Sequence, residues 1–446
     1  MAEQPQDTTP APDLVAELTQ LLIAAVADIN DGQLPDAETK LQATNLQLPA
    51  LVTHPLAYLV RARAIYVQGR IYQKRQLLAQ ALAEYRSAAD YVGESSAGDS
   101  LLPDVLFRIA LVYFSMEKLR TAREYYRQAY HIANRAQNYA VAALALESLG
   151  TIATSMDEPS EAMDYYQATR LESSRSAKPA RIAGAYQALA WLQGQYGPYE
   201  EAFINAATAE ALAATETNIA QRMNGLTEVA EVFLRGHELQ RAEVVLRQAE
   251  SLTERAADPE RQASLYLVMA QLFKAKRDWE KWQYYAHEAY RLAEEPLYKM
   301  EHGVELLRCL TFVGDSAAAH QLLLDLQAYA ATSAEEDKET TERYLALSSE
   351  AAAVHAAASQ DYVAADEHFS KATSRVGRLR RYKRASLYRE YALTLRQWAQ
   401  QSHNPNLLRR ALDQLRHSNK TFHSMALRVE EEVGNQLLAA WQSEVV

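Results

Sequence analysis

Three basic residues in the first quarter of the chain have a spacing that places them on one helix face. Arg63 and Arg70 are seven residues apart, and Lys74 follows four residues later. On a helix, residues at these intervals stack into a single stripe. Such a stripe binds carboxylates of a partner or forms ion pairs with acidic residues of the same surface. The spacing therefore indicates either a carboxylate-binding face or a network of surface ion pairs.

A second and denser basic cluster lies near residue 380. Its members are Arg375, Arg378, Arg380, Arg381, Lys383 and Arg384. Tyr382 is the only aromatic residue among them, which gives little support to stacking on nucleic-acid bases. We interpret the cluster as a solvated connection between helices. Contact with an acidic protein surface and contact with nucleic acid are the alternatives.

No residues in the sequence form a catalytic or metal-binding motif. There is no Gly-rich loop followed by Lys-Ser or Lys-Thr, no Gly-x-Gly-x-x-Gly and no His-Glu-x-x-His. The segment Gly93–Gly98 is close to a nucleophile elbow in spacing only, because that elbow requires a preceding strand. His417 and His423 fall on nearly opposite sides of a helix, and the run 366–368 points in three directions. We therefore predict a protein that is not an enzyme and has no metal or cofactor.

The composition favours helices and a reducing compartment. Hydrophobic residues make up 48% of the 446 residues, whereas Gly (14) and Pro (13) are scarce, which favours helices over strands joined by tight turns. Cys309 is the only cysteine, so no intrachain disulfide can form. Met1–Pro12 has neither the basic segment nor the apolar core that a secretory leader would show, and no uncharged apolar run is long enough to span a membrane, so we expect neither export nor insertion. We expect a cytoplasmic, all-α protein.

A pattern of two helices recurs every forty residues. In the first helix a small residue follows large ones, and in the second an Ala precedes an aromatic residue or Leu by four positions. Residues three and four apart share a helix face, and the small residue lets the two helices approach closely. The small first-helix positions are Ala110, Gly150, Ala190, Ala230 and Ala270, and the matching second-helix positions are Ala122, Ala162, Ala202, Ala242 and Trp282. Looser copies precede and follow these five.

This pattern resembles the tetratricopeptide repeat over roughly residues 14–430. The resemblance implies an α-α superhelix of about ten helix pairs, whose first helices line a concave wall. The period of 40 residues exceeds the family's usual 34, and the Pro that often closes a unit is mostly missing. Such long units are similar to those of kinesin light chains, MalT-like bacterial activators and peptide-sensing regulators of the Rap and PlcR type. We expect a long curved trough instead of a closed pocket.

We expect three segments along the chain. Residues 1–12 form a disordered tail, 13–296 regular repeats, and 297–446 irregular repeats with a C-terminal capping helix. The boundary rests on a shortened unit around Leu306–Leu324, where the curvature of a stack could change. The breaker-rich stretch Gly93–Pro103 indicates a loop, and the acidic run Ser333–Glu342 a solvated loop or helix start.

The resemblance also implies which side chains meet a ligand, because in the family these are first-helix positions just outside the core pattern. In this sequence the positions are Arg63, Tyr66, Arg70, Lys74, Phe107, Phe114, Gln187, Trp191, Asn224, Glu231, Gln271 and Lys274. Polar members of the set could hydrogen-bond a peptide backbone while Phe107, Phe114 and Trp191 take its side chains. Alternatively, these side chains only cover the inner surface, and Phe114 and Trp191 fill core between repeats.

We predict a non-catalytic scaffold or adaptor that holds a protein or peptide. A formal net charge of −11 disfavours nucleic acid as the main ligand, and no membrane partner is indicated. The alternative is a peptide-responsive regulator of the Rap or PlcR type, whose superhelix changes pitch on binding; a helical enzyme is a second alternative. The identity of the partner and the oligomeric state stay open.

Overall fold

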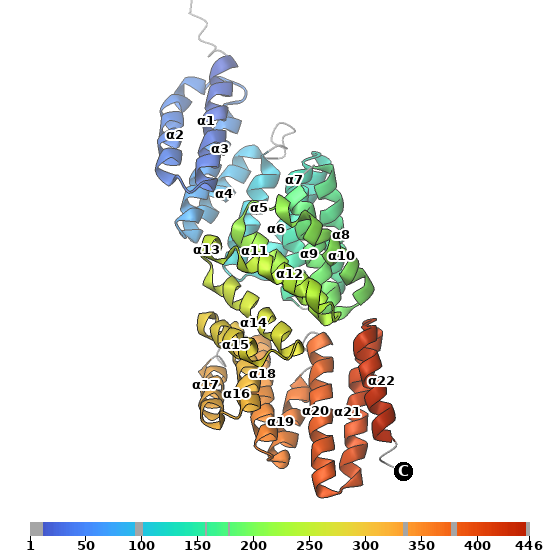
Figure 1. The fold of residues 1–446 in the computed structure, drawn as a ribbon. Helices are drawn as coiled ribbons and strands as arrows, with labels where there is room; N and C mark the ends of the chain where they lie inside the picture. The colour runs from blue at the N-terminus through green and yellow to red at the C-terminus, as the bar shows by residue number, and fades with distance from the viewer. Residues whose placement is uncertain are drawn as a thin grey trace, which may run out of the picture. The chain divides into compact units, whose positions relative to one another are not determined.

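Helices account for all the regular structure in the computed structural model, which describes residues 12–93, 101–156, 158–176, 179–332, 338–375 and 381–442. Within these residues ten helix pairs are followed by a final helix, which confirms the predicted all-α stack of about ten pairs (Figure 1). The chain divides into two compact units, unit 1 (Met1–Lys178) and unit 2 (Pro179–Val446).

Each unit is a succession of helices joined by short turns. Unit 1 contains α1 (Pro12–Asn30), α2 (Leu34–Gln47), the 3-10 helix η1 (Leu48–Leu51), α3 (Ala57–Lys74), α4 (Leu78–Val92), α5 (Leu102–Ser115), α6 (Leu119–Arg135), α7 (Tyr139–Ser155) and α8 (Pro159–Arg175). Unit 2 contains α9 (Pro179–Tyr196), α10 (Tyr199–Leu212), η3 (Ala213–Thr215), α11 (Ile219–Arg235), α12 (Leu239–Glu250), α13 (Thr253–Ala256), α14 (Pro259–Ala275), α15 (Trp279–Leu292), α16 (Pro296–Val313), α17 (Ser316–Thr332), α18 (Lys338–Ala358), α19 (Tyr362–Arg375), α20 (Arg381–Ser402), α21 (Pro405–Ser424) and α22 (Arg428–Gln442).

The small residues of the repeat lie where the two helices of a pair cross. Ala110, Ala190, Ala230 and Ala270 are each at most 1% exposed. A Cβ added to Gly150 would lie 2.9 Å from the ring of Tyr166 on the paired helix, and one added to Gly69 would lie 2.8 Å from the ring of Tyr85. An aromatic ring of the second helix thus fills the space that a first-helix side chain would occupy, so the repeat pattern is a packing rule.

Replacing Gly69 with Ala is expected to destabilise unit 1 by about 1–3 kcal/mol. The new methyl group would collide with Tyr85, whose ring is fully buried and has no room to move aside. Gly184 in α9 is the control, because nothing lies within 4 Å of its Cβ position. Gly184→Ala is expected to stabilise the fold by about 0.5–1 kcal/mol through better helix propensity. Urea unfolding followed by circular dichroism measures the change in the free energy of unfolding for each variant. Equal changes in the two variants would contradict the packing role of Gly69.

The turn inside a helix pair is closed by a backbone hydrogen bond that recurs in register. The N–H groups of Lys118, Glu158, Glu238 and Asp278 donate to the carbonyl oxygens five residues earlier at 3.0, 2.8, 3.0 and 2.9 Å. The residue before the donor is left-handed where Glu117, His237 and Arg277 occupy it, with φ of 59°, 62° and 58°. This is a Schellman turn, which usually has Gly at the left-handed position. In the same register, position 198 is Pro, which has no N–H to donate.

First helices of neighbouring pairs pack on one another. In unit 1, α1 packs on α3 and α5 on α7; in unit 2, α9 packs on α11, α11 on α14, α14 on α16 and α16 on α18. Second helices of neighbouring pairs make no contact of comparable extent in the described part of the chain. Each unit therefore curves toward its first helices, which form its inner wall as the repeat pattern predicts.

Unit 2 departs from the expected open trough. The helix α9 packs on α20 as well as on α11, although these two helices begin and end the series of first helices in this unit. An ion pair of 2.6 Å between Glu350 on α18 and Lys383 on α20 joins the last two first helices. The first helices of unit 2 thus form a closed circuit, in which the last first helix contacts the first one. We call this arrangement the closed turn, and it is distinct from the tight turns that join two helices.

Parts of several predicted segments lie outside the residues that the structure describes. Residues 1–11 of the predicted tail lie outside them, and α1 begins at Pro12. Residues 94–100 and 333–337 of the two predicted loops also lie outside, while Lys338 begins α18. The predicted boundary near residue 297 falls at the start of α16 within unit 2, whereas the compact units divide after Lys178. No described helix has the length and apolar character needed to cross a membrane.

Candidate functional site

Two first helices of unit 1 bring three arginines to its inner wall. The helix α3 carries Arg63, Tyr66 and Arg70 at intervals that share one face, and α5 carries Asp104 and Arg108 four residues apart. Asp104 attracts all three guanidinium groups, so the five side chains form one electrostatic set. We call this set the arginine cluster.

Electrostatic interactions and a hydrogen bond hold the arginine cluster in place. Tyr66 on α3 couples electrostatically to the guanidinium groups of both Arg70 and Arg108, and so relates α3 to α5. Arg70 Nη2 donates to Oδ1 of Asn30, the last residue of α1, at 2.7 Å. Arg70 is 5% exposed and Tyr66 7% exposed. The hydrogen bond to α1 thus fixes the position of one buried guanidinium, as a preorganised binding group requires.

The arginine cluster contains more positive than negative charge. Asp104 is its one carboxylate, and neither Arg70 nor Arg108 makes an ion pair within 4.0 Å with any described residue. Burial lowers the pKa of Arg70, and the positive charge of Arg108 lowers it further. Burial also raises the pKa of Asp104, against the attraction of the arginines. Positive charge held partly out of water is costly, and an anion placed beside it would relieve that cost.

The predicted basic stripe is divided in the structure. Lys74 is exposed at the end of α3, whereas Arg70 is buried against α1 and α5. The expectation that Phe107 is an exposed aromatic is wrong: it is 8% exposed, and its ring lies 5.3 Å from that of Tyr126 on α6. Phe107 belongs to the core because its ring packs on Tyr126, the aromatic residue of the second helix in this pair. Phe114 is partly buried and packs against the same core.

Sequence reasoning missed Asp104 and Arg108, although a signal for Asp104 was present. The offset from Gly69 to Ala110, both small positions of the repeat, is 41 residues, and the same offset leads from Arg63 to Asp104. Asp104 is therefore the inner-wall equivalent of Arg63 in the next pair. Arg108 has no such equivalent, and only the spacing of four from Asp104 pointed to it.

In unit 2 the predicted ligand-binding residues are engaged with one another and with neighbours. Gln187 and Asn224 each donate to a carboxylate oxygen of Glu228 at 2.8 Å, and Glu231 accepts from Arg235. The other three predicted ligand-binding residues of unit 2 are partly buried: Trp191, Gln271 and Lys274. Lys274 Nζ lies 3.2 Å from Glu305 and 5.0 Å from the centre of the Trp282 ring. These side chains form polar networks of the inner wall, and their role in binding stays a prediction.

The residues weighed for catalysis have structural partners. His417 and His423 contact the Asp413 carbonyl oxygen at 2.8 Å and Glu431 at 2.9 Å. Asp366 accepts from Arg410 at 2.6 Å. No three His, Cys, Asp or Glu side chains gather as metal ligands within the described ranges.

The basic cluster near residue 380 is also tied into unit 2. Lys383 pairs with Glu350 at 2.6 Å, and Arg375 lies 3.4 Å from Glu342. Arg381 donates to the Tyr196 carbonyl oxygen and to Ser424 Oγ, each at 2.9 Å. Arg378 and Arg380 lie outside the described residues. Arg375, Arg381 and Lys383 therefore serve contacts inside the unit.

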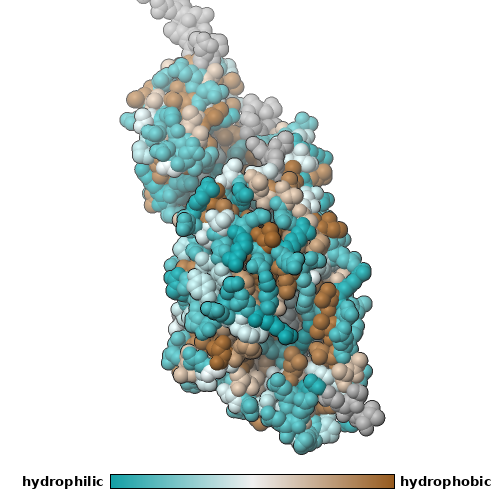
Figure 2. Space-filling model, viewed as in Figure 1, coloured by the Kyte–Doolittle hydropathy of each residue, from teal (hydrophilic) through white to brown (hydrophobic). Residues whose placement is uncertain are grey.

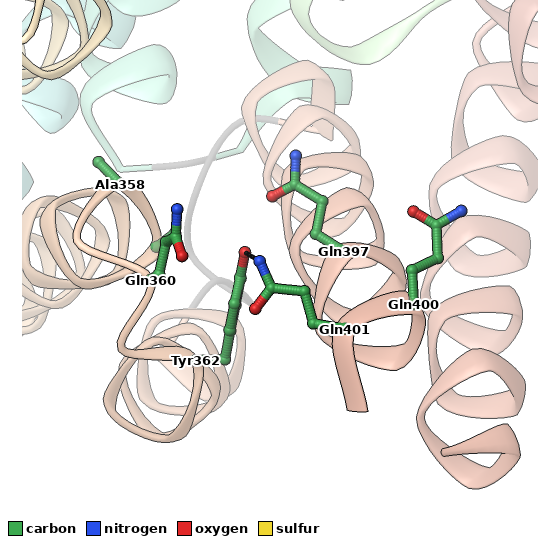
Figure 3. A pocket seen from close by; sticks show the side chains of 7 residues that line it. Ala358, Gln360, Tyr362, Gln397, Gln400 and Gln401 are labelled. Atoms are coloured by element: carbon green, nitrogen blue, oxygen red, sulfur yellow. Dashed lines mark hydrogen bonds between the residues drawn. The ribbon is translucent and has the colours of Figure 1, made fainter. Parts of the chain in front are cut away.

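A polar pocket of about 470 Å³ lies between the α18–α19 turn and the end of α20 (Figure 3). Glutamine side chains dominate its lining, which comprises Ala357, Ala358, Gln360, Tyr362, Gln397, Gln400 and Gln401. Gln401 donates to the Tyr362 hydroxyl at 3.2 Å. The pocket has no charged group in its lining, and its amides are on exposed side chains. It therefore offers a ligand much weaker attraction than the arginine cluster does.

Hydrophobic side chains reach the surface only in separate patches on the face that Figure 2 shows, with hydrophilic residues between them. An exposed aromatic contact of unit 2 joins Trp279, which is 39% exposed, to Phe312, which is 57% exposed. Their ring centres are 4.6 Å apart. Scattered exposed hydrophobics of this kind are ordinary on protein surfaces.

The paired helices and their forty-residue register define an all-α protein built from stacked helix pairs. Neither a protein-family model nor a curated protein matches the chain. Among solved structures it is similar to aspartyl phosphate phosphatase F from Bacillus subtilis, at 12% identity over 74% of this chain and 96% of that one, with a TM-score of 0.47. A Rap protein in complex with competence and sporulation factor matches at 12% identity over 96% and 98%, with a TM-score of 0.42.

A tetratricopeptide repeat protein from Parabacteroides merdae is similar at 16% identity over 65% of this chain and 97% of that one, with a TM-score of 0.39. All three TM-scores are below 0.5. Similarity at this level assigns neither a ligand nor an activity to this chain.

Proposed function

We propose that this chain is a non-catalytic, cytoplasmic scaffold that binds a protein or peptide on the inner walls of its helix stacks. In unit 1 the arginine cluster holds a carboxylate of that partner. The observation that carries the proposal is the surplus of positive charge at Arg70 and Arg108, which interact electrostatically with each other and with Tyr66 and have Asp104 as the only carboxylate of their set.

The chemistry of the site selects an acidic partner. Guanidinium groups form short, charge-assisted hydrogen bonds to carboxylates, and two of them close together favour an anion with several acceptor oxygens. Arg70 is already oriented by Asn30 and Tyr66, so little side-chain freedom is lost when an anion binds. Lys74 at the end of the same helix is an exposed positive charge, separate from the buried Arg70.

Neutralising Arg108 is expected to weaken binding of acidic peptides by about 10–100-fold, the value of one charged hydrogen bond. The probe is a peptide array with acidic and neutral sequences, each with free and amidated C-termini, and fluorescence anisotropy then measures affinity for the peptides bound. Acidic peptides should dominate the binders, and Arg108→Gln and Arg70→Gln should lose them.

The control is Arg120→Gln, which removes the same charge from an exposed position on the second helix α6. It should leave affinity unchanged. Binders without an acidic preference, or equal losses from Arg108→Gln and Arg120→Gln, would contradict the proposal.

A further inference from the structure

The turn between α9 and α10 makes a backbone contact with the turn between α21 and α22. Pro198 occupies the position at which Glu158 and Glu238 donate the hydrogen bond that closes their own turns, and it has no N–H. The next N–H in the chain, that of Tyr199, donates to the Met425 carbonyl oxygen at 2.8 Å. The first turn of unit 2 is therefore attached to the last one.

Gly197 allows this close approach. It has a φ of +84°, and a Cβ at this position would lie 2.7 Å from the Met425 Cα atom. Gly314, in the α16–α17 turn, has a nearly equal φ of +83° but nothing within 4 Å of its Cβ position. Both glycines have a left-handed backbone conformation that favours Gly. Only at Gly197 does a neighbouring backbone also leave no space for a side chain.

Side chains of α20 reinforce the contact at both of its edges. Arg381 donates to the Tyr196 carbonyl oxygen and to Ser424 Oγ, each at 2.9 Å. Arg389 Nη2 donates to the Glu430 carbonyl oxygen at 2.6 Å, and its Nη1 contacts the Glu430 carboxylate. This α20–α22 contact is completed from the α11–α12 turn by His237 Nε2, which lies 3.3 Å from Glu430 Oε1.

We propose that these contacts are a clasp that holds unit 2 as a closed turn and that can release α20–α22 from α9–α12 without unfolding the helix pairs. The clasp comprises Gly197, Tyr199, His237, Arg381, Met425 and Glu430, and Arg389 holds Glu430 in place from within α20–α22. Its function is to set whether the inner wall of unit 2 is enclosed by the circuit of first helices or open at one edge. This inference does not depend on the ligand of the arginine cluster in unit 1.

The chemistry of the clasp suits a reversible contact. Phe422, Met425 and Leu427 bury apolar surface at this junction. The other links across it are hydrogen bonds and ion pairs, each of which contributes modestly in water. Helices within a pair instead bury Ala and aromatic side chains against one another, as Ala202, Ala242 and Phe233 do. The interface that joins the two ends of the circuit therefore contains more polar links than the packing inside a helix pair does, and it can open while the pairs stay folded.

The clasp is tested by Gly197→Ala in the full chain, with Gly314→Ala as the matched control. Hydrogen exchange followed by mass spectrometry is read on peptides that cover residues 196–212 and 420–442. In Gly197→Ala both segments should exchange about tenfold faster or more, together and with circular dichroism unchanged. In Gly314→Ala, which carries the same left-handed strain, neither segment should change.

Unchanged exchange of the two segments in Gly197→Ala, or equal acceleration in both variants, would overturn the proposal. If the Gly197→Ala chain does not fold, Arg381→Met provides the same test. Faster exchange in residues 196–212 and 420–442 then supports the clasp, and faster exchange confined to α20 overturns it.

The clasp is expected to be tightest in mildly acidic solution. The hydrogen bond to Glu430 raises the pKa of His237 above 6.5, against burial and the charge of Arg389. The stabilisation of the clasp by protonated His237 is therefore complete at low pH and is lost as pH rises through the raised pKa. Burial opposes ionisation of Glu430, but His237 and Arg389 outweigh it and lower its pKa below 4.5. That contribution is lost as pH falls through the lowered value.

Exchange in the clasp segments, corrected for intrinsic rates, should therefore be faster at about pH 8 than at about pH 6. His237→Gln should remove this difference while Arg389 continues to hold Glu430. A pH dependence that persists in His237→Gln would contradict the assignment to this residue.

Discussion

Replacing Arg308 with Met is expected to lower the free energy of unfolding of unit 2 by about 3–5 kcal/mol. Arg308 on α16 forms ion pairs with Glu350 on α18 and with Glu390 on α20, the latter at 2.8 Å. Glu305 is 3.8 Å away. Glu350 is 1% exposed and Glu305 7% exposed. Removing the guanidinium would leave these carboxylates buried with Lys383 and Lys274 as their remaining cations.

The loss should shrink as the solution is acidified. Burial acts to raise the pKa of Glu350, but Lys383 and Arg308 outweigh burial and lower it to about 2. In the wild type the stabilisation from Glu350 is therefore present above its ordinary pKa of 4.5 and is lost as pH falls toward 2. Without Arg308 the pKa of Glu350 rises, and protonation relieves the buried charge at higher pH. Unfolding of the wild type and the variant by guanidinium chloride, at about pH 7 and about pH 5, measures how much the loss of stability shrinks.

Two controls separate the buried network from charge in general. Arg291→Met removes an exposed arginine that pairs with Glu288 at 2.7 Å, and it should cause no measurable change. The double variant Arg308→Met with Glu350→Gln should be more stable than Arg308→Met alone, because the stranded charge is gone. If Arg291→Met and Arg308→Met had equal effects, the network would have no special role.

Replacing Trp282 with Ala is expected to cost about 3–5 kcal/mol, whereas the same change at Trp279 should cost about 0.5–1.5 kcal/mol. Trp282 is 2% exposed and packs against Trp279 and Phe312, with ring centres 5.9 and 5.4 Å apart. Its Nε1 also donates to Glu305 Oε1 at 3.0 Å. Trp279 belongs to the same aromatic group but is 39% exposed, so its removal leaves little cavity.

Trp282→Phe separates packing from the hydrogen bond. The ring is largely kept, and the lost donor leaves the buried carboxylate of Glu305 with one partner fewer, at a cost of about 1.5–3 kcal/mol. Thermal unfolding followed by circular dichroism ranks the three variants. If Trp279→Ala proved as damaging as Trp282→Ala, the burial difference would not govern stability here.

The architecture was predictable because its cause is local and repeated. Ala110, Gly150, Ala190 and Ala230 mark helix crossings at intervals of forty residues, and each crossing needs a small residue. The turns were harder to predict from residue type, because Glu117, His237 and Arg277 occupy left-handed positions that usually signal Gly. Their conformation comes from the closing hydrogen bond of the turn and not from their own preference.

The arginine cluster was predictable only in part. Arg63, Tyr66 and Arg70 follow from spacing on one helix, but the contribution of Arg108 depends on how far α5 is rotated against α3, which no pattern in the sequence specifies. Phe107 was misplaced for the same reason, since one step of rotation separates core from inner wall. The clasp could not be predicted, because Pro198 marks an unusual turn but nothing in the sequence indicates that Tyr199 bonds to Met425.

The closed turn in unit 2 fixes how many helix pairs that unit can contain. In an open stack, a duplicated pair only lengthens the array, because each pair touches its immediate neighbours. In unit 2, duplicating the segment 219–258 would add a step of rotation and rise between α9 and α20, so the N–H of Tyr199 would no longer meet the carbonyl of Met425. Gain or loss of repeats should therefore be tolerated in unit 1 far better than in unit 2.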